Sequence, residues 1–276
     1  ALIIYLVISA VFIGCTPILS IDASTQNVYH FSDTDKNISL LDISETFGTY
    51  DGSFVLYDNN LDSWKIYNLE EATKRIPPES TYKIYDALLG LESGIITPEH
   101  SSMTWNGDAF PFPSWEADQD LNSAMQNSVN WYFQAIDSQL GINRVQEFLN
   151  KIEYGNQTTS SNLDLYWSDF SLKISPLEQV TLLKKFNTNE FHLNSQNVFS
   201  VKNAIKIAST PNGNFYGKTG TGRVNGQDIN GWFIGYVETS DNSYYFATNI
   251  QSDSNATGKK AFEITSDILK KLHIWN

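Results

Sequence analysis

The sequence predicts an α/β protein of the α+β kind, with a central antiparallel sheet flanked by helices and a helical lobe beside it. Runs rich in aromatic and β-branched residues, which favour strands, occur at 52–57 and 63–67 and again at 231–238 and 243–250. The long stretch between these two pairs instead carries apolar residues at helical spacing. Strands that begin and end the folded part of a chain around a helical segment favour one sheet covered by helices.

The composition is that of a globular, acidic protein. Hydrophobic residues make up 41% and aromatic residues 13% of the 276 residues, which excludes the disordered and fibrous classes. The formal net charge of −13 opposes contact with a phosphate backbone, so we expect no nucleic acid partner. A single cysteine, Cys15, excludes an internal disulfide and a multi-cysteine metal site, and the four histidines lack metal-ligand spacing. No metal site is therefore expected.

Residues 1–21 contain no charged side chain and are long enough to cross a bilayer, so we predict a transmembrane helix there. A leader is the alternative, because Gly14-Cys15 ends a stretch that loosely resembles a lipid-attachment box, and a buried core helix is a third interpretation. Residues 22–40 are polar, have no sustained period and suit a tether. The globular domain is expected over 41–276.

Local patterns predict the elements in turn. The segments 58–62 and 239–242 have turn composition and separate the paired strand-like runs, so each pair is predicted to form a hairpin. Ser175, followed by Pro176 and then by Glu178, is a capping box with proline at the first helical position. The further predicted helices cover 80–91, 121–136, 143–152, 195–207 and 259–272.

Ser80 and Lys83 form the first candidate for chemistry. Pro77-Pro78 end the preceding structure, so Ser80 is expected at a helix start, with Lys83 one turn along on the same face. Partial burial and the helix dipole favour a neutral amine, which can take the serine proton. The pair is a nucleophile with its base, although S-x-x-K also arises by chance and is weak alone.

Two further motifs follow along the chain. Ser128-Val129-Asn130 lies within the predicted helix 121–136, and Lys218-Thr219-Gly220, continued by Thr221, lies on a predicted strand between glycines. The glycines keep one strand edge open, and the amine, hydroxyls and backbone donors suit a carboxylate and an amide. Alone, this stretch can equally be a turn before the strand at Trp232. In the order S-x-x-K, S-x-N, K-T-G, the three motifs form the signature of the penicillin-interacting serine enzymes.

Other motifs narrow the resemblance. Tyr154-Gly155-Asn156 and Tyr166-Trp167 are typical of the class D β-lactamase fold. Over about residues 45–274 the chain resembles the extracellular penicillin-binding sensor domain of staphylococcal-type β-lactam receptors. These receptors are the signal transducers that control penicillinase and methicillin resistance. The most similar stretches are 80–85, 125–132, 216–222 and 230–236. The resemblance implies a class D β-lactamase/penicillin-binding fold over the domain at 41–276.

The resemblance also implies partners and a location. The protein would lie in the cell membrane with the sensor domain extracellular, and β-lactam antibiotics would bind to it. A zinc protease would precede the sensor in the same full-length protein. A transcriptional repressor would be reached only indirectly.

By resemblance, the motif residues take catalytic roles. Ser80 would be acylated by the β-lactam carbonyl, and Lys83 would be the base, carrying a carbamate formed with carbon dioxide. Ser128 would relay a proton to the departing lactam nitrogen. Lys218 would work beside it and help to hold the drug carboxylate.

The binding residues follow in the same way. Thr219, Gly220 and Thr221 would line the binding strand, with the hydroxyls on the drug carboxylate and the Thr221 N–H completing an oxyanion hole with that of Ser80. Trp167 would lie against the lysine pocket. Many class D hydrolases carry an arginine after K-T-G, and residues 251–260 contain none, so the threonines are expected to recognise the carboxylate.

Two hypotheses about activity remain. In a receptor the acyl group stays on Ser80, whereas in a class D β-lactamase a base activates water to release it. Asn130 is the discriminating residue, because hydrolytic class D enzymes usually place an apolar residue there to protect the lysine carbamate. The sequence therefore favours a sensor with little turnover. A cell-wall transpeptidase is disfavoured by the match at 154–156.

Overall fold

The computed structural model describes residues 37–276. The predicted membrane segment 1–21, and the tether up to residue 36, lie outside the described residues. Among the helices of the described part, none is both long and apolar enough to span a bilayer.

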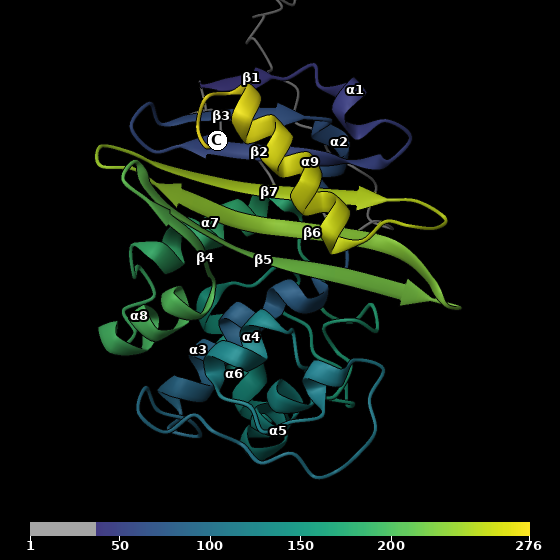
Figure 1. Cartoon of the computed structure of the whole chain (residues 1–276), viewed down its shortest axis with the longest axis vertical. Helices are drawn as coiled ribbons and strands as arrows, with labels where there is room; N and C mark the ends of the chain where they lie inside the picture. Colours follow the sequence, from purple (N-terminus) through teal and green to yellow (C-terminus); the bar gives the residue numbers. More distant parts are fainter. Residues whose placement is uncertain (1–36) are drawn as a thin grey trace, which may run out of the picture.

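A seven-stranded sheet in the order β1-β3-β2-β7-β6-β5-β4 forms the centre of the fold (Figure 1). Both predicted hairpins are confirmed, and β2 pairs antiparallel with β7, so the two ends of the domain meet in one sheet as expected. Strand β1 pairs parallel with β3 and falls in the segment expected to be tether, so the ordered sheet begins at Ile38. The strands are β1 (Ile38–Leu40), β2 (Asp51–Asp58), β3 (Ser63–Tyr67), β4 (Lys206–Thr210), β5 (Gly213–Val224), β6 (Gln227–Glu238) and β7 (Ser243–Gln251).

Helices cover both faces of this sheet. In Figure 1, α9 lies across one face, while α4, α5 and α6 gather in a lobe beyond β5, which confirms the predicted helical lobe. The helical elements are α1 (Ser44–Phe47), α2 (Leu69–Thr73), η1 (Glu79–Tyr82), α3 (Lys83–Glu92), η2 (Pro113–Trp115), α4 (Leu121–Gln126), α5 (Asn130–Leu140), α6 (Ile142–Ile152), α7 (Pro176–Asn187), α8 (Ser195–Ala204) and α9 (Gly258–Lys271). The predicted capping box begins α7, because Ser175 Oγ accepts from Glu178 N at 3.2 Å and Ser175 N donates to the Glu178 carboxylate at 2.9 Å.

Two helix predictions were wrong in part. The helix expected at 121–136 is broken between α4 and α5, because Ser128 has φ +54°, a left-handed conformation that interrupts a right-handed helix. The helix expected at 195–207 ends at Ala204, and the chain then pairs with β5 as β4. Local apolar spacing cannot reveal either change, since both depend on contacts with β5.

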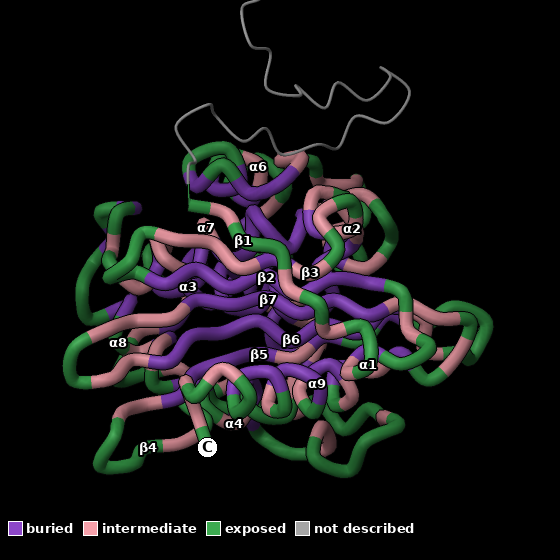
Figure 2. The backbone as a smooth tube through the Cα atoms, turned by 90° about the horizontal axis from the view of Figure 1, so that it is seen from above, coloured by how far each residue is buried: buried purple, intermediate pink, exposed green. Residues whose placement is uncertain are grey.

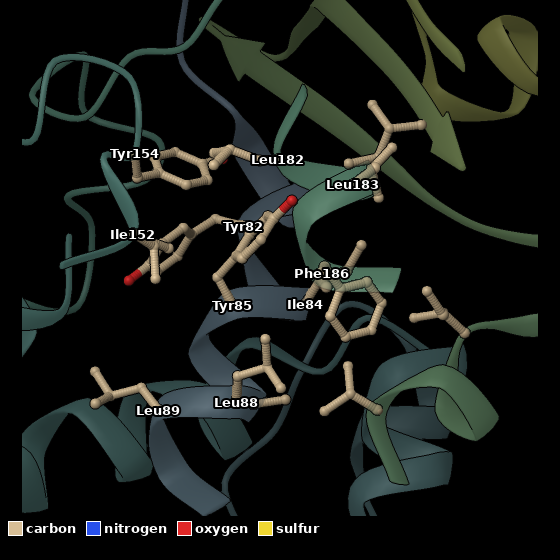
Figure 3. Close-up of a cluster of buried hydrophobic side chains, with 14 of the residues drawn as sticks. Tyr82, Ile84, Tyr85, Leu88, Leu89, Ile152, Tyr154, Leu182, Leu183 and Phe186 are labelled. Atoms are coloured by element: carbon tan, nitrogen blue, oxygen red, sulfur yellow. The ribbon is translucent and has the colours of Figure 1, made fainter. Parts of the chain in front are cut away.

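Alternate side chains of the central strands enter two separate cores, as the two-residue period of a strand requires. Phe54 and Phe233 pack with α9, whereas Val55 and Trp232 pack with the helices of the other face. Figure 2 shows the central strands as a band of buried residues, with exposed residues at the loops. In Figure 3, Tyr82 and other side chains at the start of α3 converge with residues of α6 and α7. The turn that leads into α3 is thus anchored from several sides.

Candidate active site

Ser80 lies in the short η1 turn, and Lys83 is the first residue of α3. The expected one-turn relation is present, because Lys83 Nζ donates to Ser80 Oγ at 2.9 Å. The lysine is only 1% exposed, and this burial lowers the pKa of its amine to about 8. The negative charges of Asp86, Glu79 and Asp137 act in the other direction and raise the pKa, but burial has the larger effect. A substantial fraction of the amine is therefore neutral near physiological pH and can act as a base.

Asn130, the first residue of α5, closes the pocket around this amine. Its Oδ1 accepts from Lys83 Nζ at 2.7 Å, so the lysine donates to both the nucleophile and the amide. The Trp167 and Phe133 rings lie 5.4 and 5.6 Å from the amine, measured to the ring centroids. Trp167 thus lies against the lysine, as expected. The amide contact with the lysine exists without an acyl group on Ser80.

The break between α4 and α5 brings Ser128 to face β5. Lys218 Nζ donates to Ser128 Oγ at 3.0 Å and to the carbonyl of Thr219 at 3.0 Å. Burial, aided by the charge of Lys83, holds the pKa of Lys218 well below its usual range. The two lysines are therefore linked electrostatically, and protonation of one disfavours protonation of the other.

A groove of about 480 Å³ runs between the helical lobe and β5. Gly220 brings the strand close to the nucleophile, because a Cβ atom there would lie 3.2 Å from Ser80 N. Thr221 Oγ1 accepts from Gly258 N at 2.8 Å, which orients this hydroxyl at the rim. The groove contains every predicted site residue except the buried Lys83, Trp167 and Lys218 behind it; its lining comprises Ser80, Phe112, Ser114, Trp115, Asn127, Ser128, Asn130, Thr219, Gly220, Thr221, Arg223, Asp228 and Thr257.

Sequence reasoning missed several residues of the groove. Arg223 follows Thr219 and Thr221 at two-residue steps, so a strand places all three on one side. This two-residue period of β5 is the signal that could have identified Arg223. Its guanidinium is exposed and pairs with Asp228, at 2.8 Å from Nε to the carboxylate. The aromatic pair Phe112 and Trp115 comes from a long loop, and no local pattern assigned that loop to the site. Within residues 37–276, no group of three or more metal-ligating side chains converges.

The protein-family model described as the penicillin binding protein transpeptidase domain matches residues 35–270, which is most of the chain. The chain belongs to this family. Membership agrees with the three motifs, which this fold brings to one groove.

Similar proteins place the chain within this penicillin-binding family. The chain is 45% identical, over its whole length, to the regulatory protein BlaR1 of Bacillus licheniformis, of which it covers 45%. The C-terminal domain of the Bacillus licheniformis BlaR penicillin-receptor is 46% identical and superposes with a TM-score of 0.84, covering 87% of this chain and 98% of that domain. The class D β-lactamase BAT-2 is 37% identical with a TM-score of 0.80, covering 86% and 97%. The predicted resemblance and the class D β-lactamase fold are both confirmed.

Proposed function

We propose that this chain is a β-lactam sensor, which a penicillin or cephalosporin acylates on Ser80 and in which the acyl group persists. One observation carries the proposal: Lys83 Nζ donates both to Ser80 Oγ and to Asn130 Oδ1, so the base is placed for acylation and held as an amine. The similarity to a penicillin-receptor domain over nearly all of that domain supports the same function.

Acylation follows from the contacts around the groove. Ser80 Oγ attacks the lactam carbonyl while its proton passes to the neutral Lys83 amine. The developing oxyanion lies between the backbone N–H groups of Ser80 and Thr221, whose fixed dipoles stabilise it. The lactam C–N bond then breaks and the nitrogen takes the proton of Ser128. The proton that Lys83 received from Ser80 then restores the Ser128 hydroxyl by way of the Lys218 amine, which is hydrogen-bonded to it. Thr219 Oγ1 and Thr221 Oγ1 hold the drug carboxylate.

Persistence depends on the state of the lysine. A carbamate formed from carbon dioxide on Lys83 would supply the general base that activates a deacylating water. Burial and the lowered pKa of Lys83 fit its formation, because only a neutral amine reacts with carbon dioxide. Asn130 opposes it, because an acceptor at 2.7 Å stabilises the free amine. The balance favours a long-lived acyl group over hydrolysis.

Intact-protein mass spectrometry after mixing with a penicillin tests this function. A sensor gains the mass of the whole penicillin, because opening the lactam ring releases no fragment. It keeps that mass for many hours, because no base activates the water needed for deacylation. The alternative, a class D β-lactamase, rests on the similarity to BAT-2 and predicts that the adduct disappears within seconds to minutes while the drug is consumed. Absence of any adduct, with the drug left unconsumed, would refute both functions.

The signalling role extends this proposal beyond the groove. We place the sensor outside the cell membrane, with residues 1–21 as the membrane anchor and a zinc protease upstream in the full-length protein. The chain spans about half the length of the regulatory protein BlaR1, which leaves room for such a region in that relative. Occupancy of Ser80 would then induce resistance genes through loss of a repressor. Detergent-phase partitioning of residues 1–276, compared with 37–276, tests the anchor.

A further inference from the structure

Glu79 is a buried acid immediately before the nucleophile. Its residue is only 6% exposed, and its backbone has φ +52°, a left-handed conformation that is unfavourable for a residue with a side chain. The backbone is held there because Glu79 N donates to the carbonyl of Trp167 at 3.0 Å. The orientation of the Ser80 N–H, one peptide further on, depends on this conformation.

A chain of amides holds the carboxyl group in place. Asn230 Nδ2 donates to Glu79 Oε1 at 3.2 Å and to the carbonyl of Pro77 at 3.1 Å. Asn249 Nδ2 in turn donates to Asn230 Oδ1 at 2.9 Å, which fixes the orientation of that amide. Gly222 leaves the space for the carboxyl group, because a Cβ atom there would lie 2.4 Å from Glu79 Oε1. Strands β5, β6 and β7 thus all position one acid.

The surroundings of this acid favour its uncharged form. Burial raises the pKa of Glu79 to about 8, although the Asn230 hydrogen bond and the charge of Lys83 favour the carboxylate. Glu79 lines a small hollow together with Gly222 and Arg223. The guanidinium of Arg223 is exposed and pairs with Asp228. Among the described residues, Lys83 is the charged group whose field acts on Glu79, and Arg223 is the other charged residue that lines this hollow. At neutral pH the side chain is mainly a carboxylic acid.

We propose that Glu79 is a positioning residue for acylation: as an uncharged acid it fixes the turn that carries Ser80, and as a carboxylate it opposes the oxyanion that develops beside Ser80. This inference rests on the proposed acylation of Ser80. It adds a determinant of the acylation rate that lies outside the three motifs, namely the protonation state of the residue before the nucleophile.

The direction of the effect follows from charge. The oxyanion forms at the Ser80 N–H, so a negative carboxylate on the neighbouring residue raises the energy of that transition state. The carboxylate also favours the protonated form of Lys83, which cannot accept the serine proton. Both effects slow acylation when Glu79 ionises. For one nearby unit charge in a partly screened interior, the loss is on the order of tenfold.

The test compares rates of labelling by a fluorescent penicillin at pH 6.5 and pH 9.5. The ratio used is the rate at pH 9.5 divided by the rate at pH 6.5. It is measured for the parent protein, for Glu79→Gln and for the control Glu70→Gln, which changes an exposed glutamate on α2. Lys83 titrates in all three proteins, but only in the parent and in Glu70→Gln can an ionised Glu79 raise the pKa of Lys83, and that change is one of the two effects that the ratio measures. We expect the ratio of Glu79→Gln to exceed that of the parent on the order of tenfold, and the ratio of Glu70→Gln to equal the parent's.

The outcomes separate this inference from the proposed function. Equal ratios in the parent and Glu79→Gln would overturn the positioning role while leaving acylation of Ser80 intact. Absence of labelling in every protein would overturn the proposed function and this inference with it. Glu79→Ala is the second variant, checked for folding by circular dichroism: we expect slower labelling at pH 6.5, since the turn loses its anchor, but a ratio as high as that of Glu79→Gln. A ratio equal to the parent's in both variants would refute the role.

Discussion

Replacing Asn130 with valine removes the acceptor from the lysine pocket and leaves a side chain of similar size. In the parent, the Lys83 amine donates to two oxygens, Ser80 Oγ at 2.9 Å and Asn130 Oδ1 at 2.7 Å. The valine leaves only the first. Since the charged amine depends on acceptors more than the neutral amine does, the substitution favours the neutral form.

The size of this effect can be estimated from the contact. A hydrogen bond from a charged donor contributes about 1.5 to 3 kcal/mol, and one pKa unit corresponds to about 1.36 kcal/mol. The pKa of Lys83, already lowered to about 8 by burial, should therefore fall by about one to two further units. A lysine that is neutral at lower pH acts as a base at lower pH and forms a carbamate more readily.

Two measurements check this reasoning. The rising limb of acylation rate against pH should move by about one to two units toward acid in Asn130→Val. The acyl adduct, followed by mass spectrometry, should disappear faster in the variant, and added bicarbonate should accelerate its loss further. Asn127→Val, a neighbouring change at the groove without contact to Lys83, is the matched control. An unmoved pH limb together with an unchanged adduct lifetime would remove Asn130 from the mechanism and reopen the hydrolase hypothesis.

Three further changes test other parts of the structure. Ser80→Ala should abolish labelling by a fluorescent penicillin and leave the unfolding transition almost unchanged; surviving labelling would exclude Ser80 as the nucleophile. Ser128→Ala removes the proton relay beside Lys218, so the acylation rate measured by stopped-flow should fall about a hundredfold, and a smaller loss than tenfold would argue against the relay. Leu88→Ala opens a cavity in the core under α3 and should reduce the free energy of unfolding by about 2 to 5 kcal/mol in a urea titration, in contrast to a conservative change at exposed Leu61.

The sequence predicted those elements whose signals are local. The hairpins at 52–67 and 231–250 are encoded by strand-forming runs and turn residues, and the capping box at Ser175 is complete within four residues. The Ser80–Lys83 contact also follows from a spacing of three in one turn. In each case the residues that decide the conformation are neighbours along the chain.

The remaining features depend on distant parts of the chain. Nothing around Ser128 breaks the amphipathic pattern, and its left-handed backbone is supported by a hydrogen bond from Lys218, 90 residues later. The segment at 206–210 pairs as a strand only because the edge of β5 lies beside it. Glu79 carries no signal at all in the sequence, since its burial requires the space above Gly222 and the amide of Asn230. These features could not be predicted from the sequence because they depend on contacts between residues that are far apart along the chain.

The groove has one wall from the helical lobe and one from β5, and its groups come from distant parts of the chain. The hydrogen bond between Lys83 and Asn130 joins residues 47 apart, and that between Lys218 and Ser128 joins residues 90 apart. Such contacts are costly in chain entropy, because each of them requires a long loop to close. A partly folded chain, even one with α3 intact, would lack the second wall. Covalent capture of a penicillin therefore offers a count of fully folded molecules, against which expression, refolding yield and the effect of any variant can be normalised.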